Sequence, residues 1–244
     1  MSVETRINPN LVRIASRGLL RSLSKGITLT GEENIPKEGP AIVVANHMGI
    51  LEALAPFAYL TQTPVMFTKM ENLRIPLIGS LLNKLESIPV NRGEVDRQAL
   101  RAVTTVLIDG KGVIFACPEG TRGRDRDGNR TVLKKAKSGI IFIAQKAANE
   151  LQKPIPISPW AIWGTEGILP EVTEPGPIKQ RLMLHRDHVF ITVGAPYFIR
   201  PSNQRPTKEN MQAQIDFVMC QIRDMLPEKY HGFYAKNSEL ELNL

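Results

Sequence analysis

The stretch Ala41–Glu52, AIVVANHMGILE, most restricts the folds that are open to this chain. It begins with a short, wholly apolar run that is rich in Val and Ile and ends at an Asn-His pair. Glu52 follows His47 after four intervening residues and stands at the head of an apolar segment, Ala53–Leu60. A run of this kind that leads into a helical pattern is typical of a buried strand feeding a helix.

His47 is expected at the carboxyl end of that strand, where the side chains of a parallel sheet face ligands. Glu52 would lie one to two helical turns further on. A carboxylate that holds one imidazole nitrogen leaves the other as a base near neutral pH. A lone histidine in a loop is more often a structural residue. The carboxylate at this offset makes a catalytic His47–Glu52 pair an equally good interpretation, before other motifs are counted.

Strand and helix patterns alternate along the rest of the chain. Strands are expected at Ile27–Thr30, Pro64–Thr68, Ser87–Val90, Val113–Cys117, Ile155–Ile162 and Val189–Val193. Helices are expected at Pro76–Leu85, Val95–Ile108, Lys134–Glu150 and Thr207–Leu226, the last with Thr207 as its cap. The alternation predicts a single α/β domain with a mostly parallel central sheet flanked by helices. We expect this domain to span residues 27–230, and residues 231–244 to form a tail.

The first 26 residues predict an amphipathic helix. Its basic residues recur every four positions and would form one stripe: Arg13, Arg17, Arg21 and Lys25. An apolar face adjoins the stripe and consists of Leu11, Ile14, Ala15, Leu19 and Leu23. Like charges repel at this spacing, and an anionic surface would relieve that repulsion by ~1 kcal/mol per residue. Such a helix either lies on a membrane surface or packs on its own domain with a solvated basic face, and we favour the first slightly because of the motifs in the rest of the chain.

The composition limits the kinds of partner that this protein is expected to bind. A net charge of +7 favours an anionic partner, which could be a nucleic acid, a phospholipid surface or a phosphorylated substrate. No apolar run reaches the ~20 residues that cross a bilayer, and the N-terminus does not resemble a signal peptide. We therefore expect a cytoplasmic protein. Its two cysteines and four histidines are scattered, which argues against a disulfide framework and a metal site.

Two further stretches place charged groups after predicted strands. Lys69 follows one strand and Arg92 follows another, so both would emerge at the sheet edge that holds His47. A Lys and an Arg that converge there suit a phosphate, although either alone is more often a solvated charge.

The second stretch is PEGTR, Pro118–Arg122, directly after an apolar strand. Gly120 permits a tight turn whose backbone N–H groups can face an anion. Thr121 can donate a hydroxyl, and Arg122 a guanidinium fork. Glu119 could orient Arg122 or approach His47. This loop has no evident role in a core, so it is the strongest single indication of an oxyanion ligand.

Together these blocks resemble the glycerolipid acyltransferase family, whose members acylate lysophosphatidic acid and related lysophospholipids. The blocks occur in the family's order as NHMGILE, KMENLRIPLIG with IPVNR, ACPEGTRG and IPISPWAIWG. Three positions depart from the family pattern: Glu52 replaces the usual Asp, Gly49 a common Ser and Glu86 a common Gly. By this resemblance His47 is the general base and Glu52 its carboxylate partner. The substrate and its phosphate would be bound by Asn46, Lys69, Arg92, Glu119, Gly120, Thr121 and Arg122.

The resemblance implies transfer of a fatty acyl group from acyl-CoA or acyl carrier protein to a lysophospholipid hydroxyl. The favoured acceptor is 1-acyl-glycerol-3-phosphate, which would give phosphatidic acid. Glycerol 3-phosphate or another lysolipid is the alternative acceptor. No metal or bound cofactor is implied, and the enzyme would associate peripherally with the inner face of the membrane. A non-enzymatic membrane-binding module is the competing interpretation. A nucleic-acid binder is disfavoured because no binding motif is found, and a serine hydrolase because no Gly-x-Ser-x-Gly is present.

Overall fold

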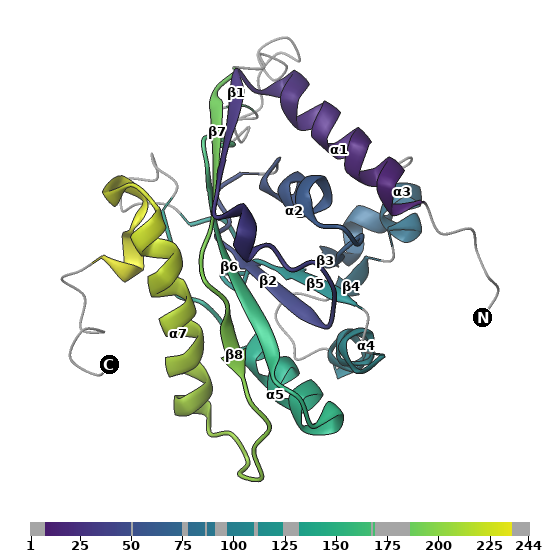
Figure 1. Ribbon diagram of the computed structural model, residues 1–244, viewed down its shortest axis with the longest axis vertical. Helices are drawn as coiled ribbons and strands as arrows, with labels where there is room; N and C mark the ends of the chain where they lie inside the picture. The colour runs from purple at the N-terminus through teal and green to yellow at the C-terminus, as the bar shows by residue number, and fades with distance from the viewer. Residues whose placement is uncertain are drawn as a thin grey trace.

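A central sheet organises the protein. The computed structural model describes residues 8–49, 51–74, 78–85, 87–90, 97–109, 112–123, 132–166, 168 and 186–235. Within them an eight-stranded sheet has the order β1-β7-β6-β2-β5-β3-β4, and β8 also pairs with β6. The strands are β1 Gly26–Thr30, β2 Ala41–Ala45, β3 Val65–Lys69, β4 Ile88–Val90, β5 Val113–Ala116, β6 Ile155–Trp163, β7 His188–Val193 and β8 Tyr197–Ile199. The strand that precedes His47 therefore lies in the middle of the sheet (Figure 1).

The sheet is mostly parallel, as the sequence predicted. β2 runs parallel to both of its neighbours, β5 and β6. The exceptions are β7 and β8, which both pair antiparallel with β6, and the edge strand β1, which pairs parallel with β7 and so shares its direction. The nine-residue β6 is long enough for β8 to pair near its start and β7 near its end. β8 was not predicted.

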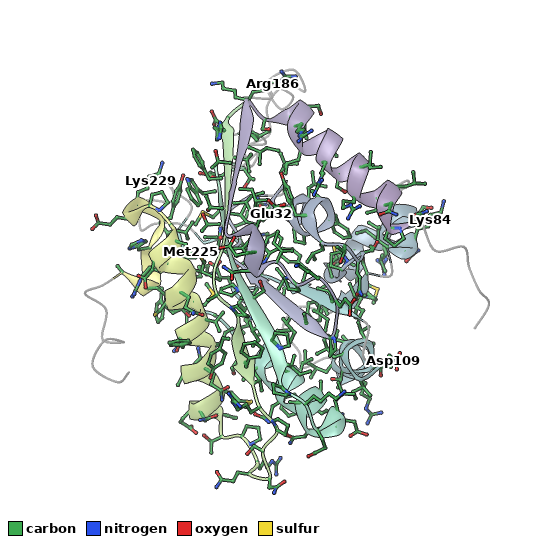
Figure 2. All side chains as sticks on the ribbon, viewed as in Figure 1. Glu32, Lys84, Asp109, Arg186, Met225 and Lys229 are labelled. Carbon is green, nitrogen blue, oxygen red and sulfur yellow. The ribbon has the colours of Figure 1, made fainter. Side chains whose placement is uncertain are left out.

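Helices cover both faces of the sheet (Figure 1). They are α1 Pro9–Leu23, α2 Leu54–Tyr59, α3 Ile78–Lys84, α4 Arg97–Ile108, α5 Gly139–Leu151 and α7 Lys208–Met225. Alternate residues of β2 enter different cores: Ile42 and Val44 pack with residues of α4, α5 and α7, and Val43 packs with residues of α1 and α2. Figure 2 shows side chains filling both layers. Because β2 is buried on both faces, the backbone that leads to His47 is firmly held.

The N-terminal helix is attached to the domain through one face. Leu20 is fully buried, and Arg17 Nε donates to the carbonyl oxygen of Ala58 at 2.6 Å. The Arg17 guanidinium also lies 5.0 Å from the ring centroid of Tyr59. The predicted basic stripe is therefore interrupted, because Arg17 is used to attach α1 to α2. In the described segments, no helix combines the length and apolar character that a membrane crossing requires.

The chain is packed through residues 231–235, the first part of the predicted tail 231–244, and the rest of that tail lies outside the described residues. Two short helical turns follow α7, at Glu228–Tyr230 and Gly232–Tyr234, and Tyr234 is fully buried. These turns bind the non-helical segment around Leu133: Leu133 N donates to the Tyr230 carbonyl at 2.8 Å, and Phe233 N donates to the Leu133 carbonyl at 2.9 Å. This pairing explains why α5 begins at Gly139 and not at residue 134 as predicted.

Candidate active site

His47 and Glu52 form a hydrogen-bonded pair at the carboxyl end of β2. His47 Nδ1 lies 2.5 Å from Glu52 Oε1. The imidazole is 27% exposed, whereas the Glu52 side chain is 2% exposed. Among the described residues, none hydrogen-bonds to His47 Nε2. A buried carboxylate thus fixes one nitrogen of a partly exposed ring and leaves the other unbonded by the described residues, which is the arrangement that a general base requires.

The second carboxylate oxygen of Glu52 is held by its own partners. Oε2 accepts the Gly49 N–H at 2.9 Å and lies 3.4 Å from the hydroxyl oxygen of Thr165. A Cβ at position 49 would lie 3.2 Å from this oxygen and 3.0 Å from the Thr165 hydroxyl. Glycine at position 49 therefore avoids crowding against Thr165, the backbone of Glu166 and the carboxylate of Glu52. Thr165 fell outside every sequence motif, and nothing in its local pattern indicated this contact.

The side chain of Asn46 hydrogen-bonds to the backbone of a neighbouring strand. Its Nδ2 donates to the Ile162 carbonyl at 2.6 Å, and its Oδ1 accepts the Ile162 N–H at 2.8 Å. The residue is fully buried, so the substrate contact predicted for it does not fit its position. The Cys117 thiol donates to the Asn46 carbonyl at 3.6 Å, and burial raises the pKa of that thiol well above its ordinary value. Asn46 joins β2 to β6 and fixes the start of the His47 segment.

Glu119 connects the PEGTR loop to the histidine. Its Oε1 accepts the backbone N–H of His47 at 2.8 Å, and its Oε2 accepts the backbone N–H of Lys134 at 2.6 Å. Burial raises the pKa of Glu119 to about 8, and the charge of Glu52 acts in the same direction, against the two N–H donors. Glu119 approaches His47, as one of the two sequence alternatives held, but through the main chain. Its bonds favour a structural role over the contact with substrate that was predicted.

The rest of the loop turns sharply. Gly120 adopts a positive φ of 72°, and its N–H donates to the Cys117 carbonyl at 3.0 Å. This N–H therefore closes the turn, and the expectation that backbone N–H groups of the turn face an anion stays a prediction. Thr121 Oγ1 accepts a hydrogen bond from Lys134 Nζ at 2.9 Å. Arg122 follows in the same loop and is half-buried.

Two predicted site residues are only partly described or not described. Lys69 ends β3, and its backbone is paired with Val90 of β4 in a parallel register. The end of β3 therefore lies on the same sheet as the end of β5, its other neighbour. Arg92 and the side chain of Lys69 lie outside the described residues. Their predicted convergence on a phosphate stays a prediction.

Comparison with known proteins identifies the family. The family model named Acyltransferase matches residues 26–163, which is more than half of the chain and includes every predicted site residue. The chain belongs to the acyltransferase family. The matched region of this acyltransferase ends with β6, so α7 and the turns that bind Leu133 lie outside it.

Individual relatives agree with this assignment. The chain is 35% identical over 127 residues to a 1-acyl-sn-glycerol-3-phosphate acyltransferase of Borreliella burgdorferi, covering 51% of this chain and 48% of that protein. It is 30% identical over 146 residues to a lysophospholipid acyltransferase of Xenopus tropicalis, covering 58% of this chain and 26% of that protein. These alignments therefore span half or less of the relatives' own lengths.

A solved structure supports the fold. The crystal structure of the 1-acyl-sn-glycerophosphate acyltransferase from Thermotoga maritima superposes with a TM-score of 0.66 at 23% identity. The match covers 89% of this acyltransferase and 79% of that chain. It shows that the sheet and its flanking helices have the architecture of that structure.

Proposed function

We propose that the protein transfers a fatty acyl group from an acyl thioester to the hydroxyl of a lysophospholipid. The observation that carries this proposal is the 2.5 Å contact between His47 Nδ1 and the buried Glu52 carboxylate, on an imidazole that is partly exposed. The acyltransferase names of the relatives support the reaction type. We favour 1-acyl-glycerol-3-phosphate as the acceptor and phosphatidic acid as the product, with glycerol 3-phosphate or another lysolipid as the alternative acceptor.

The reaction needs one base and one proton donor in sequence. His47 Nε2 removes the proton of the acceptor hydroxyl while the oxygen attacks the thioester carbonyl. The new ester C–O bond forms, the C–S bond breaks, and the imidazolium returns the proton to the departing thiolate. Glu52 stabilises the positive imidazolium throughout. General-base catalysis of this kind contributes roughly 10²–10⁴-fold to the rate. The donor thiol is that of coenzyme A or of acyl carrier protein.

A purely structural membrane-binding module is the weaker alternative. Such a module has no use for an imidazole that a buried carboxylate orients beside a loop with a Lys–Thr contact. Burying a carboxylate such as that of Glu52 costs free energy. A protein that only binds membranes would gain nothing in return for this cost.

The decisive experiment incubates purified protein with acyl-CoA, or with acyl carrier protein bearing the same chain, and each candidate acceptor in mixed micelles. Mass spectrometry of the lipid product and release of free thiol measure the transfer. We expect phosphatidic acid from 1-acyl-glycerol-3-phosphate. His47→Ala should abolish transfer and leave the folded sheet intact by circular dichroism. Full activity of that variant would contradict the assignment of the base.

We further propose that α1 binds an anionic membrane surface and brings the site to its lipid substrates. Three apolar side chains on its outer face support this: Leu11 is 61% exposed, Ile14 66% and Leu19 47%. Exposed Arg21 and Lys25 lie on the same helix or directly after it, and each can contribute ~1 kcal/mol on such a surface.

Cosedimentation with vesicles that contain phosphatidylglycerol tests the role of α1. Replacing Leu11 and Ile14 together with Ser should lower vesicle binding by roughly tenfold or more, because two buried side chains are worth about 1.5–3 kcal/mol each. Phe142→Ser is the matched control, since Phe142 of α5 is 43% exposed but lies on another helix. Equal losses in both variants would contradict the assignment of this surface to α1.

A further inference from the structure

The segment 132–137 lies beside the PEGTR loop, although no motif of the sequence includes it. Lys134 contacts this loop twice: its backbone N–H donates to Glu119 Oε2 at 2.6 Å, and its Nζ donates to Thr121 Oγ1 at 2.9 Å. The other oxygen of the same Glu119 carboxylate accepts the His47 N–H. The buried side chain of Glu119 therefore links the backbone of His47 to the backbone of Lys134.

Lys137 reaches the same loop from three positions further along. Its backbone N–H donates to the Pro118 carbonyl at 3.0 Å. Its side chain lies over the turn, because a Cβ at Gly120 would be 3.7 Å from Nζ and 3.8 Å from Cε of Lys137. Two ammonium groups thus lie at Gly120 and Thr121, next to the loop that carries Arg122.

Both lysine backbones are held rigidly. Leu133 pairs with the turns after α7, and the Ala136 N–H donates to the buried hydroxyl of Tyr234 at 3.0 Å. Lys135 leaves the segment in another direction, with its Nζ 5.7 Å from the ring centroid of Phe233. The side chains of Lys134 and Lys137 therefore lie at the PEGTR loop, whereas that of Lys135 lies at the turns after α7.

We propose that Lys134 and Lys137 bind the phosphate monoester of the acceptor and set the preference for this headgroup. The inference rests on the proposed function and names side chains outside the PEGTR motif. A phosphate monoester carries close to two negative charges near neutral pH, and two ammonium groups can neutralise both. Zwitterionic or uncharged headgroups gain less from the pair. Because both lysine backbones are fixed relative to His47, the distance from the phosphate site to the base is restricted as well. This favours acceptors whose phosphate and reacting hydroxyl are separated by a matching distance.

Three single variants test the proposal: Lys134→Gln, Lys137→Gln and, as the matched control, Lys135→Gln. Each keeps the backbone N–H and removes one charge. We expect the KM for 1-acyl-glycerol-3-phosphate to rise roughly tenfold in the first two variants, since a hydrogen bond to a charged group contributes about 1.5 kcal/mol. The KM for monoacylglycerol or lysophosphatidylcholine, where these are accepted, and kcat should change less than threefold. The control variant should match the wild type throughout.

Inorganic phosphate provides a second probe. It should inhibit the wild type competitively with the acceptor, and its inhibition constant should rise in the Lys134 and Lys137 variants but not in the Lys135 variant. Lys134→Arg, which keeps the charge, should restore most of the affinity. An equal loss of kcat with all acceptors, or identical behaviour of the three glutamine variants, would overturn the proposal.

The failure of this inference can be distinguished from failure of the proposed function. If the wild type acylates no acceptor, the function is refuted. The phosphate site is then tested by direct binding of 1-acyl-glycerol-3-phosphate to the wild type and to the same variants, measured by isothermal titration. A weaker affinity in the Lys134 and Lys137 variants alone supports the site, and unchanged affinity in all of them refutes it.

Discussion

Replacing Glu52 with Gln should lower kcat by about 10²–10⁴-fold with little change in KM. In the wild type, Oε1 holds the His47 ring at 2.5 Å, and Oε2 accepts the N–H of Gly49 at 2.9 Å. An amide has only one oxygen to serve both positions. If its oxygen faces Gly49, its NH₂ group faces His47 Nδ1 and imposes the tautomer that carries the proton on Nε2. That tautomer cannot act as the base, and the negative charge that stabilises the imidazolium is lost as well.

Steady-state kinetics with acyl-CoA and a saturating acceptor measure this change, and urea unfolding provides the control. An unsatisfied buried donor costs about 1–3 kcal/mol, so the variant should remain folded. A Glu52→Gln enzyme with wild-type kcat would refute the view that this carboxylate orients and charges the base. A proportional rise of KM with unchanged kcat would do the same, because it would place Glu52 in substrate binding.

The length of the carboxylate provides a finer test. Glu52→Asp withdraws the carboxylate by about 1.5 Å, one C–C bond, which would lengthen the contact with His47 beyond hydrogen-bond range if the backbone stays in place. We expect a kcat between those of the wild type and of Glu52→Gln. Gly49→Ser should be better tolerated when it is combined with Glu52→Asp than when it is made alone, since the serine Cβ would no longer approach the longer carboxylate at 3.2 Å. Equal effects of the serine in both backgrounds would show that the two positions are independent.

Three further changes address stability. Burial raises the pKa of Glu119 to about 8 from 4.5, so this group stabilises the fold at low pH and the contribution is lost as the pH rises through 8. Urea unfolding of Glu119→Gln should therefore show a flatter pH dependence than the wild type between pH 5 and 8, and parallel curves would contradict this. Tyr234→Phe removes the hydroxyl that donates to Asp216 at 2.6 Å and should cost about 1–3 kcal/mol by the same assay. Leu20→Ala in α1 should cost roughly 2–5 kcal/mol and make α1 more sensitive to trypsin, whereas unchanged cleavage would show that Leu20 does not anchor the helix.

Local pattern was sufficient for the general plan of the fold. Apolar runs alternate with amphipathic segments, and such periodicity depends only on which faces of each element avoid water. The strand Ala41–Ala45, the cap at Thr207 and the mostly parallel sheet were all predicted in this way and are present. The offset between His47 and Glu52 also belongs to one short stretch of chain, so their pairing could be anticipated from sequence.

Contacts between distant segments were decided only by the tertiary structure. The antiparallel direction of β7 and β8 depends on which strand each one meets, and no local pattern records that. Lys134 was predicted to begin a helix, yet its segment is bound by the turns after α7, is not helical and lies beside the PEGTR loop. Glu119 and Asn46 resembled ligand-binding groups, but both are occupied by backbone groups of remote residues. The sequence by itself supplies the reactive side chains and their order along the chain. Which of them are free to react, and which partners they meet, is decided by the tertiary structure, because a hydrogen bond forms only where the fold brings donor and acceptor together.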